Sequence, residues 1–295
     1  MPLIATLIAN PARPVLDRQL ADRAFAALGA SRIDWLAEGI AADLILPEGT
    51  MVDAATTIAS QAVAGAPVDI VVQEAATRRK KLLIADMDST MIDQECIDEL
   101  ADEVGLKERV AEITARSMNG EIAFEPALRE RVALLAGLET DVIERIIESR
   151  ITLAAGGRAL VATMNATGAW TALVSGGFLS FTGPIAGKLG FRENRANRLI
   201  EENGRLAGTV AEPILGRAAK AEALTEIAGR LGISVNDALA VGDGANDLDM
   251  LAMAGSGVAL HAKPAVAAQA RIRIDHGDLT ALLYMQGYRK EEFVT

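Results

Sequence analysis

The chain has 295 residues, of which 51% are hydrophobic, and its 40 acidic and 29 basic side chains give a formal net charge of −11. This length predicts about two or three domains, and the apolar fraction is ample for packed cores and excludes long disordered segments. The acidic balance argues against nucleic acid as the main partner, although a small anionic substrate can still bind in a locally cationic pocket.

The cellular setting follows from three further features. The single cysteine, Cys96, cannot form an intramolecular disulfide, which is typical of a reducing compartment. The opening stretch PLIATLIANP has no cationic start and breaks at Asn10-Pro11, unlike a signal peptide. No stretch approaches the ~18 consecutive apolar residues of a membrane span. We therefore expect a cytoplasmic protein with no membrane partner.

The first 76 residues predict a domain of their own. Strand-like and helix-like stretches alternate in the order β-α-β-β-α-β, which is the order of the ferredoxin-like fold. Gly29 is expected to end the first helix. The basic run TRRKK at 77–81 then predicts a solvated linker. The expected strands cover 3–9, 31–37, 41–47 and 68–75, and the expected helices 13–30 and 53–66.

From residue 82 onward the pattern predicts an α/β domain over 82–295, with a Rossmann-like parallel sheet wound by crossover helices. Between its first two strands lie about 80 mostly helical residues, which predict a helical cap inserted at about 95–155. Thr140 is expected to cap one cap helix, and Asn203-Gly204 predicts a hairpin over 198–210. The expected strands cover 82–86, 171–175, 238–243, 257–260 and 271–275.

Polar residues follow these strands at the edge where open α/β sheets bind their ligands. Carboxylates there can hold Mg²⁺, a serine hydroxyl and glycine amides can bind phosphate oxygens, and a lysine can neutralise charge. One carboxylate can attack phosphorus, while a second protonates the leaving alcohol. The pattern therefore predicts phosphoryl transfer. The residues are Asp86, Asp88, Thr90, Ser175, Gly176, Gly177, Gly242, Asp243, Asn246 and Asp247, with Lys220 in the helix before the third strand.

These motifs resemble a known family. DMDST (86–90), SGG (175–177), a lone lysine and GDGAND (242–247) are similar to the haloacid dehalogenase superfamily of phosphatases. Glu95 and the stretch MNGEIAFEPALRERVALL (118–135) resemble the phosphoserine phosphatases within it. The resemblance covers about residues 82–285.

The resemblance implies roles for the acidic residues and the asparagine. Asp86 would be the nucleophile and Asp88 the general acid and base. Mg²⁺ would be held by the Asp86 carboxylate, the Asp88 backbone carbonyl and Asp243. Asn246 and Asp247 would orient the waters of the metal, with Asn246 also near the substrate.

The resemblance also implies how substrate is bound. Ser175, Gly176 and Lys220 would grip the phosphoryl group. In the cap, Glu95 would take the substrate ammonium and Arg131 its carboxylate, and a guanidinium suits a carboxylate bidentately. Met118 and Phe124 would pack over the site.

The activity implied is hydrolysis of O-phospho-L-serine to L-serine and phosphate through an aspartyl-phosphate, the last step of serine biosynthesis. The alternative is a phosphotransferase or phosphatase of the same superfamily that acts on another small amino-alcohol phosphate, such as phosphohomoserine. A sensor or scaffold with an inactive core is disfavoured by the intact set of catalytic residues.

Three features outside these motifs complete the prediction. The amino-terminal unit resembles ACT-like regulatory domains, but its turn NPARP (10–14) lacks the glycine of members that bind an amino acid. Homodimerisation or packing against the core is its expected role. Cys96 is expected to be a buried apolar residue. His261 and His276 are isolated and are assigned no role.

Overall fold

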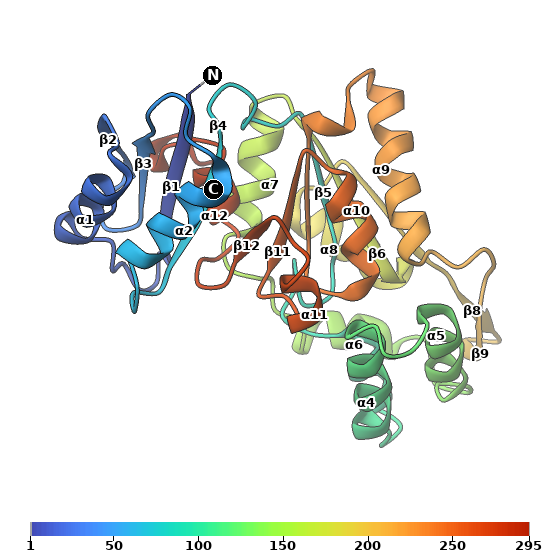
Figure 1. Ribbon diagram of the computed structural model, residues 1–295. Helices are drawn as coiled ribbons and strands as arrows, with labels where there is room; N and C mark the ends of the chain where they lie inside the picture. Colours follow the sequence, from blue (N-terminus) through green and yellow to red (C-terminus); the bar gives the residue numbers. More distant parts are fainter. Residues whose placement is uncertain (1, 295) are drawn as a thin grey trace.

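The amino-terminal sheet is antiparallel, with strands in the order β2-β3-β1-β4. The structure is a computed structural model that describes residues 2–294 (Figure 1). Helices α1 and α2 bury their apolar residues against this sheet, which confirms the predicted βαββαβ fold. The elements are β1 (Leu3–Ala9), α1 (Arg18–Leu28), β2 (Arg32–Ala37), β3 (Ala41–Ile45), α2 (Val52–Ala62) and β4 (Val68–Glu74).

Helix α1 shows how local sequence sets an element. The Asp17 carboxylate accepts a hydrogen bond from the backbone N–H of Leu20 at 2.7 Å and so caps the first turn. Gly29 ends the helix in the left-handed conformation, with φ of 60°, as predicted. The helix is therefore shorter at its start than the predicted 13–30.

The second sheet is parallel and has six strands in the order β12-β11-β10-β5-β6-β7. Apolar clusters fill both of its faces, as expected for a doubly wound sheet. Its strands are β5 (Leu82–Ala85), β6 (Trp170–Phe178), β7 (Glu193–Asn197), β10 (Ala238–Gly242), β11 (Ser256–Leu260) and β12 (Ile272–Ile274). The helices are α7 (Gly157–Ala166), α8 (Leu179–Leu189), α9 (Arg217–Leu231), α10 (Leu248–Met253), α11 (Pro264–Ala267) and α12 (Ala281–Tyr284), with 3-10 turns at Val235–Asp237, Ala245–Asp247 and Lys290–Glu292.

Two strands differ from the prediction. Strand β7 was not expected, because ENRAN has neither apolar alternation nor β-branched residues. It forms because it pairs with the edge of β6. Strand β6 runs on through Ser175 to Phe178, so the SGG motif lies within the strand and does not follow it.

The cap is built from two separate parts of the chain, which lie together at one end of the parallel sheet (Figure 1). The first part is the predicted helical insertion, and the second is the predicted hairpin, in which Asn203 and Gly204 both have positive φ. Leu206 of the hairpin connects the two parts. Its N–H donates a hydrogen bond to the carbonyl of Leu138, and its carbonyl accepts one from the N–H of Gly137, both at 2.8 Å. The elements are α3 (Cys96–Asp102), α4 (Lys107–Met118), α5 (Phe124–Ala133), α6 (Val142–Ser149), β8 (Leu199–Glu202) and β9 (Arg205–Val210).

The prediction that Thr140 caps a cap helix is wrong. Helix α6 begins after Asp141, and no side-chain hydrogen bond caps it. The Thr140 hydroxyl instead donates to the carbonyl of Gly204 in the hairpin, at 3.3 Å. Thr140 is thus close enough to cap the helix, but its hydroxyl bonds the hairpin and caps nothing.

The basic run 77–81 is solvent-exposed only in part, at Thr77, Arg79 and Lys81. Arg78 forms an ion pair with buried Asp43 at 2.7 Å, and Arg79 lies over the ring of Tyr288. Lys80 is buried and donates to the carbonyl of Asn236 at 2.8 Å. The run connects the two sheets, and two of its four charged side chains, Arg78 and Lys80, are docked at the junction.

The amino-terminal domain packs against the parallel-sheet domain. Packing against the core was one of its two expected roles, beside homodimerisation. Asp69 of β4 accepts hydrogen bonds from the backbone N–H groups of Asp275, His276 and Gly277. Arg289 reaches back to the Asp34 carboxylate at 2.6 Å. Within residues 2–294 no helix combines the length and apolar character needed to cross a membrane.

Candidate active site

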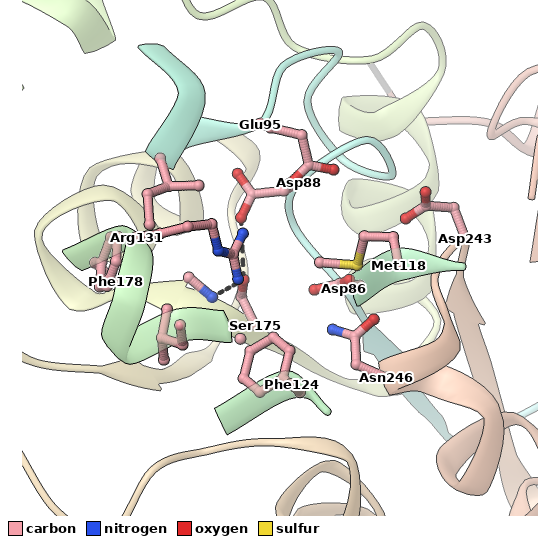
Figure 2. Close-up of a pocket in the computed structure, with 14 residues that line it drawn as sticks. Asp86, Asp88, Glu95, Met118, Phe124, Arg131, Ser175, Phe178, Asp243 and Asn246 are labelled. Atoms are coloured by element: carbon pink, nitrogen blue, oxygen red, sulfur yellow. Dashed lines mark hydrogen bonds between the residues drawn. The ribbon is translucent and has the colours of Figure 1, made fainter. Parts of the chain in front are cut away.

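A cavity lies where the parallel sheet meets the cap (Figure 2). Ten of the twelve predicted site residues line it, and the other two, Lys220 and Asp247, lie directly behind Asp86. The lining residues are Asp86, Asp88, Glu95, Ile97, Met118, Phe124, Leu128, Arg131, Ser175, Gly176, Gly177, Phe178, Asp243 and Asn246.

Buried ion pairs form the floor of this cavity. Asp86 directly follows β5, and its Oδ1 lies 2.8 Å from Nζ of Lys220 on α9. The same Nζ lies 2.7 Å from Oδ1 of Asp247, and all three side chains are almost fully buried. Burial on its own lowers the pKa of Lys220, but Asp247 and Asp86 outweigh it and hold that pKa above its ordinary value. The ammonium therefore stays charged between two carboxylates.

A group of carboxylates beside this lysine fits a metal ion. Ligand oxygens of Asp86, Asp243 and Asp247 lie within 4.8 Å of one another. Oδ2 of Asp243 and Oδ1 of Asn246 are buried and accept no hydrogen bond, whereas both oxygens of Asp247 are engaged, by Lys220 and by the N–H of Gly244. Burial, and next Asp86, raise the pKa of Asp243 to about 6. A hard cation satisfies such oxygens, so the residues present fit one.

Asp88 stands two residues beyond Asp86 with a different environment. Its Oδ1 accepts the backbone N–H of Cys96 at 3.0 Å, and its Oδ2 lies 3.5 Å from the Ser175 hydroxyl. Burial raises the pKa of Asp88 to about 6, and the Asp86 charge adds to this shift. Asp88 can therefore carry a proton near neutral pH, and its Oδ2, beside the Ser175 hydroxyl, can give that proton to a group bound in the cavity.

The glycines of the SGG motif allow the close approach of the cap. A Cβ on Gly176 would lie 2.6 Å from Cζ of Phe124, and one on Gly177 would lie 2.7 Å from Oδ2 of Asp88. Gly177 also donates its N–H to the Ser175 hydroxyl at 2.9 Å. A side chain at Gly176 would meet Phe124 of the cap, and one at Gly177 would meet Asp88, so glycine lets β6 pass close to both.

The cap contributes one charge of each sign. Glu95 precedes α3 and accepts the Ser89 hydroxyl at 2.8 Å, while burial and the Asp88 charge raise the pKa of Glu95 well above its ordinary value. A cation placed beside Glu95 would offset this shift and stabilise the ionised carboxylate. Arg131 of α5 is 2% exposed, and its guanidinium reaches into the cavity (Figure 2).

Several residues at the site gave no signal in the sequence. Ile97, Leu128 and Phe178 line the cavity as ordinary apolar residues of their elements. Lys263 lies 3.5 Å from Oδ2 of Asp243. These four residues can be recognised as part of the site only from their positions in the folded structure.

Asn197 is a fifth residue that the sequence did not mark, because strand β7 itself was not predicted. Its buried carboxamide donates to the carbonyl of Gly176 at 2.8 Å and to that of Leu215 at 3.2 Å. It also accepts the N–H of Leu215 at 2.6 Å. Asn197 thus ties the glycine motif to the loop that leads into the helix of Lys220.

Comparison with known families settles the superfamily. The haloacid dehalogenase-like hydrolase family matches residues 83–252. This chain belongs to that family. The resemblance drawn from the motifs is thereby confirmed.

The chain is similar to proteins named phosphoserine phosphatase. The relative from Streptomyces coelicolor is 40% identical over 80% of this chain and 58% of its own length, and that from Archaeoglobus fulgidus 46% identical over 66% and 57%. This chain therefore spans less than two thirds of both. The relative from Albidiferax ferrireducens is 45% identical over 69% of this chain and 88% of its own length.

Solved structures extend the likeness. A phosphoserine phosphatase with an analogue of its phospho-aspartyl intermediate is 42% identical, with a TM-score of 0.67, over 70% of this chain and 98% of that chain. A probable phosphoserine phosphatase from Vibrio cholerae is 29% identical, with a TM-score of 0.78, over 99% and 88%. The second likeness takes in the amino-terminal domain as well.

Proposed function

We propose that this protein hydrolyses O-phospho-L-serine to L-serine and phosphate, the last step of serine biosynthesis, by way of an aspartyl-phosphate. The observation that carries the proposal is the charge pattern of the cavity that Asp86, Glu95 and Arg131 line. Lys220 lies behind Asp86 on the sheet side, and Glu95 and Arg131 lie on the cap side. A phosphorylated amino acid carries a phosphate, an ammonium and a carboxylate, and each has one matching partner. The names of the relatives agree with this substrate.

In the first half of the reaction, Asp86 attacks phosphorus. Its Oδ1 is engaged by Lys220 and by the N–H of Met87, both at 2.8 Å, which leaves Oδ2 to form the new O–P bond. The bond between phosphorus and the seryl oxygen breaks, and Asp88 gives that oxygen a proton. A carboxyl pKa of about 6 suits this donation, because a useful fraction is protonated near neutral pH.

In the second half, water replaces the enzyme on phosphorus. Asp88, now ionised, takes a proton from the water as the water oxygen attacks, and the Asp86–phosphorus bond breaks. Inorganic phosphate leaves, and both aspartates return to their starting forms. Ser175, Gly176 and Lys220 hold the phosphoryl oxygens throughout, and Met118 and Phe124 of the cap exclude other water.

The metal in this proposal is Mg²⁺, which the Asp86 carboxylate, the Asp88 backbone carbonyl and Asp243 would hold. These are hard oxygen ligands, and no histidine or thiolate lies among them, so Mg²⁺ suits the set better than Zn²⁺. When bound it neutralises charge on the phosphoryl oxygens. Asn246, with its free buried Oδ1, and Asp247 orient the waters around it.

Phosphate release from small phosphomonoesters tests the proposal. Phosphoserine is expected to be the best substrate of a panel that includes phosphoethanolamine and phosphohomoserine, with Mg²⁺ present. Chelation is expected to abolish release and Mg²⁺ to restore it, whereas full activity after exhaustive chelation contradicts the metal. Transfer of phosphate to added homoserine, in place of release to water, would identify a phosphotransferase.

Two further roles concern assembly and location. Homodimerisation through the amino-terminal domain stays a prediction, and light scattering of the purified chain measures it. Action in the cytoplasm follows from the biosynthetic role proposed here.

A further inference from the structure

The guanidinium of Arg131 is buried without a carboxylate partner. Its side chain forms no ion pair within 4.0 Å among residues 2–294, although it is 2% exposed. Its Nε donates to the carbonyl of Ala127 at 3.1 Å, and one terminal nitrogen donates to the Thr114 hydroxyl at 2.9 Å. Because both acceptors are neutral, the positive charge of the guanidinium is not balanced inside the protein and is available to pair with an incoming anion.

The direction of the hydrogen bonds at Thr114 is set by chemistry. A guanidinium has no acceptor, so the Thr114 oxygen must accept from Arg131. The single hydroxyl proton is then shared between Oδ1 of Asp98 at 2.8 Å and the carbonyl of Val110 at 3.0 Å. The hydroxyl therefore stands between Asp98 and Arg131 and keeps this carboxylate from pairing directly with the guanidinium.

We propose that Thr114 is a positioning residue that sets substrate selectivity by orienting Arg131 without neutralising it. The inference rests on the proposed function, in which Arg131 binds the substrate carboxylate. Thr114 is 3% exposed on α4 and does not line the cavity, so it acts only through Arg131. Its bonds connect α3, which begins after Glu95, with α5, which carries Arg131.

Two substitutions at this position separate the hydroxyl from the shape of the side chain. Thr114→Val keeps the branched shape and removes the hydroxyl, whereas Thr114→Ser keeps the hydroxyl. The readout is the ratio of kcat/KM for phosphoserine to kcat/KM for phosphoethanolamine, which lacks the carboxylate. We expect Thr114→Val to lower this ratio on the order of tenfold, as for loss of a hydrogen bond to a charged group. Thr114→Ser is expected to retain most of the ratio.

Two controls exclude a merely structural effect. Thr182 of α8 is buried, and its hydroxyl donates to Asn194 at 2.9 Å away from the cavity, so Thr182→Val removes a comparable bond. It is expected to lower the melting temperature without changing the ratio. In an Arg131→Ala background, Thr114→Val is expected to change the ratio no further.

The outcomes distinguish this inference from the proposed function. A wild-type protein that hydrolyses phosphomonoesters without preference for phosphoserine overturns the proposed substrate and this inference with it. A selective wild type whose ratio is unchanged in Thr114→Val overturns the role of Thr114 alone. An equal loss in Thr114→Ser and Thr114→Val, or a further loss in the Arg131→Ala background, also overturns it.

Discussion

The two halves of the cavity are built in different ways. On the sheet side, Lys220 lies 2.7 to 2.8 Å from Asp247 and Asp86, and these charges are paired within the protein. On the cap side, Glu95 and Arg131 form no ion pair with each other or with a third residue among residues 2–294. The sheet side is thus electrostatically organised before substrate arrives, which is the arrangement that lowers a reaction barrier. The cap side is left with one acidic and one basic side chain that have no ionic partner, and a substrate ammonium beside Glu95 would stabilise its ionised form.

The sharpest test of the sheet side is Asp86→Asn. An amide is too weak a nucleophile to form the phosphoenzyme, so turnover is expected to fall on the order of 10⁴-fold or more. Phosphate release measures the loss, and acid quenching of the wild-type protein with labelled phosphoserine is expected to leave label on Asp86. Label on a serine or histidine would falsify the mechanism.

The cap side is tested by Arg131→Ala. Loss of a charge-assisted bidentate contact is expected to lower kcat/KM for phosphoserine by roughly ten- to a hundredfold. Phosphoethanolamine, which lacks the carboxylate, is expected to keep most of its rate. A uniform loss on both esters would instead point to damage to the fold of the cap.

The complementary change is Glu95→Gln. The amide keeps the size of the side chain and removes the negative charge, so esters that carry an ammonium are expected to lose about tenfold. Phosphoglycolate, with a carboxylate and no ammonium, serves as the comparison and is expected to lose less. Equal losses on phosphoserine and phosphoglycolate contradict the assignment.

A smaller effect is expected at Asn197, which supports the sheet side from strand β7. Asn197→Asp can still accept from Leu215 but can no longer donate to the carbonyl of Gly176, at 2.8 Å. Inhibition by inorganic phosphate is expected to weaken about fivefold, while inhibition by L-serine is unchanged. Asn194→Asp, in the same strand, is the matched control because its Oδ1 only accepts from Thr182. If L-serine inhibition weakens equally, Asn197 is not specific to the phosphate end.

The smallest effect on activity is expected from the junction of the two domains. Asp69→Ala leaves the three backbone N–H groups of Asp275, His276 and Gly277 without their acceptor. The free energy of unfolding is expected to fall by about 2–4 kcal/mol, measured by urea denaturation. The ratio of kcat to KM is expected to stay at the wild-type value, and a drop would show that the junction contributes to the site.

The residues that gather near the carboxyl ends of the parallel strands were predictable. The carboxyl ends of adjacent parallel strands must meet, so Asp86, Ser175 and Asp243 could be placed at one edge without coordinates. The structure brings all twelve predicted residues to one cavity or directly behind it. The βαββαβ order, the parallel sheet and the helical insertion were likewise readable, because each rests on hydrophobic periodicity and turn residues.

Local patterns in the sequence were therefore enough to predict the family, the set of residues near the strand ends and the order of most elements, although not strand β7. Tertiary packing set the pairing of β7, the joining of the hairpin to the cap, and the docking of Arg78 and Lys80 from the basic run 77–81. It also decided that Thr114, rather than a carboxylate, meets Arg131. The physical reason is that a charged or polar side chain takes whichever partner the packing places within about 3 Å, and spacing along the chain carries no record of that partner.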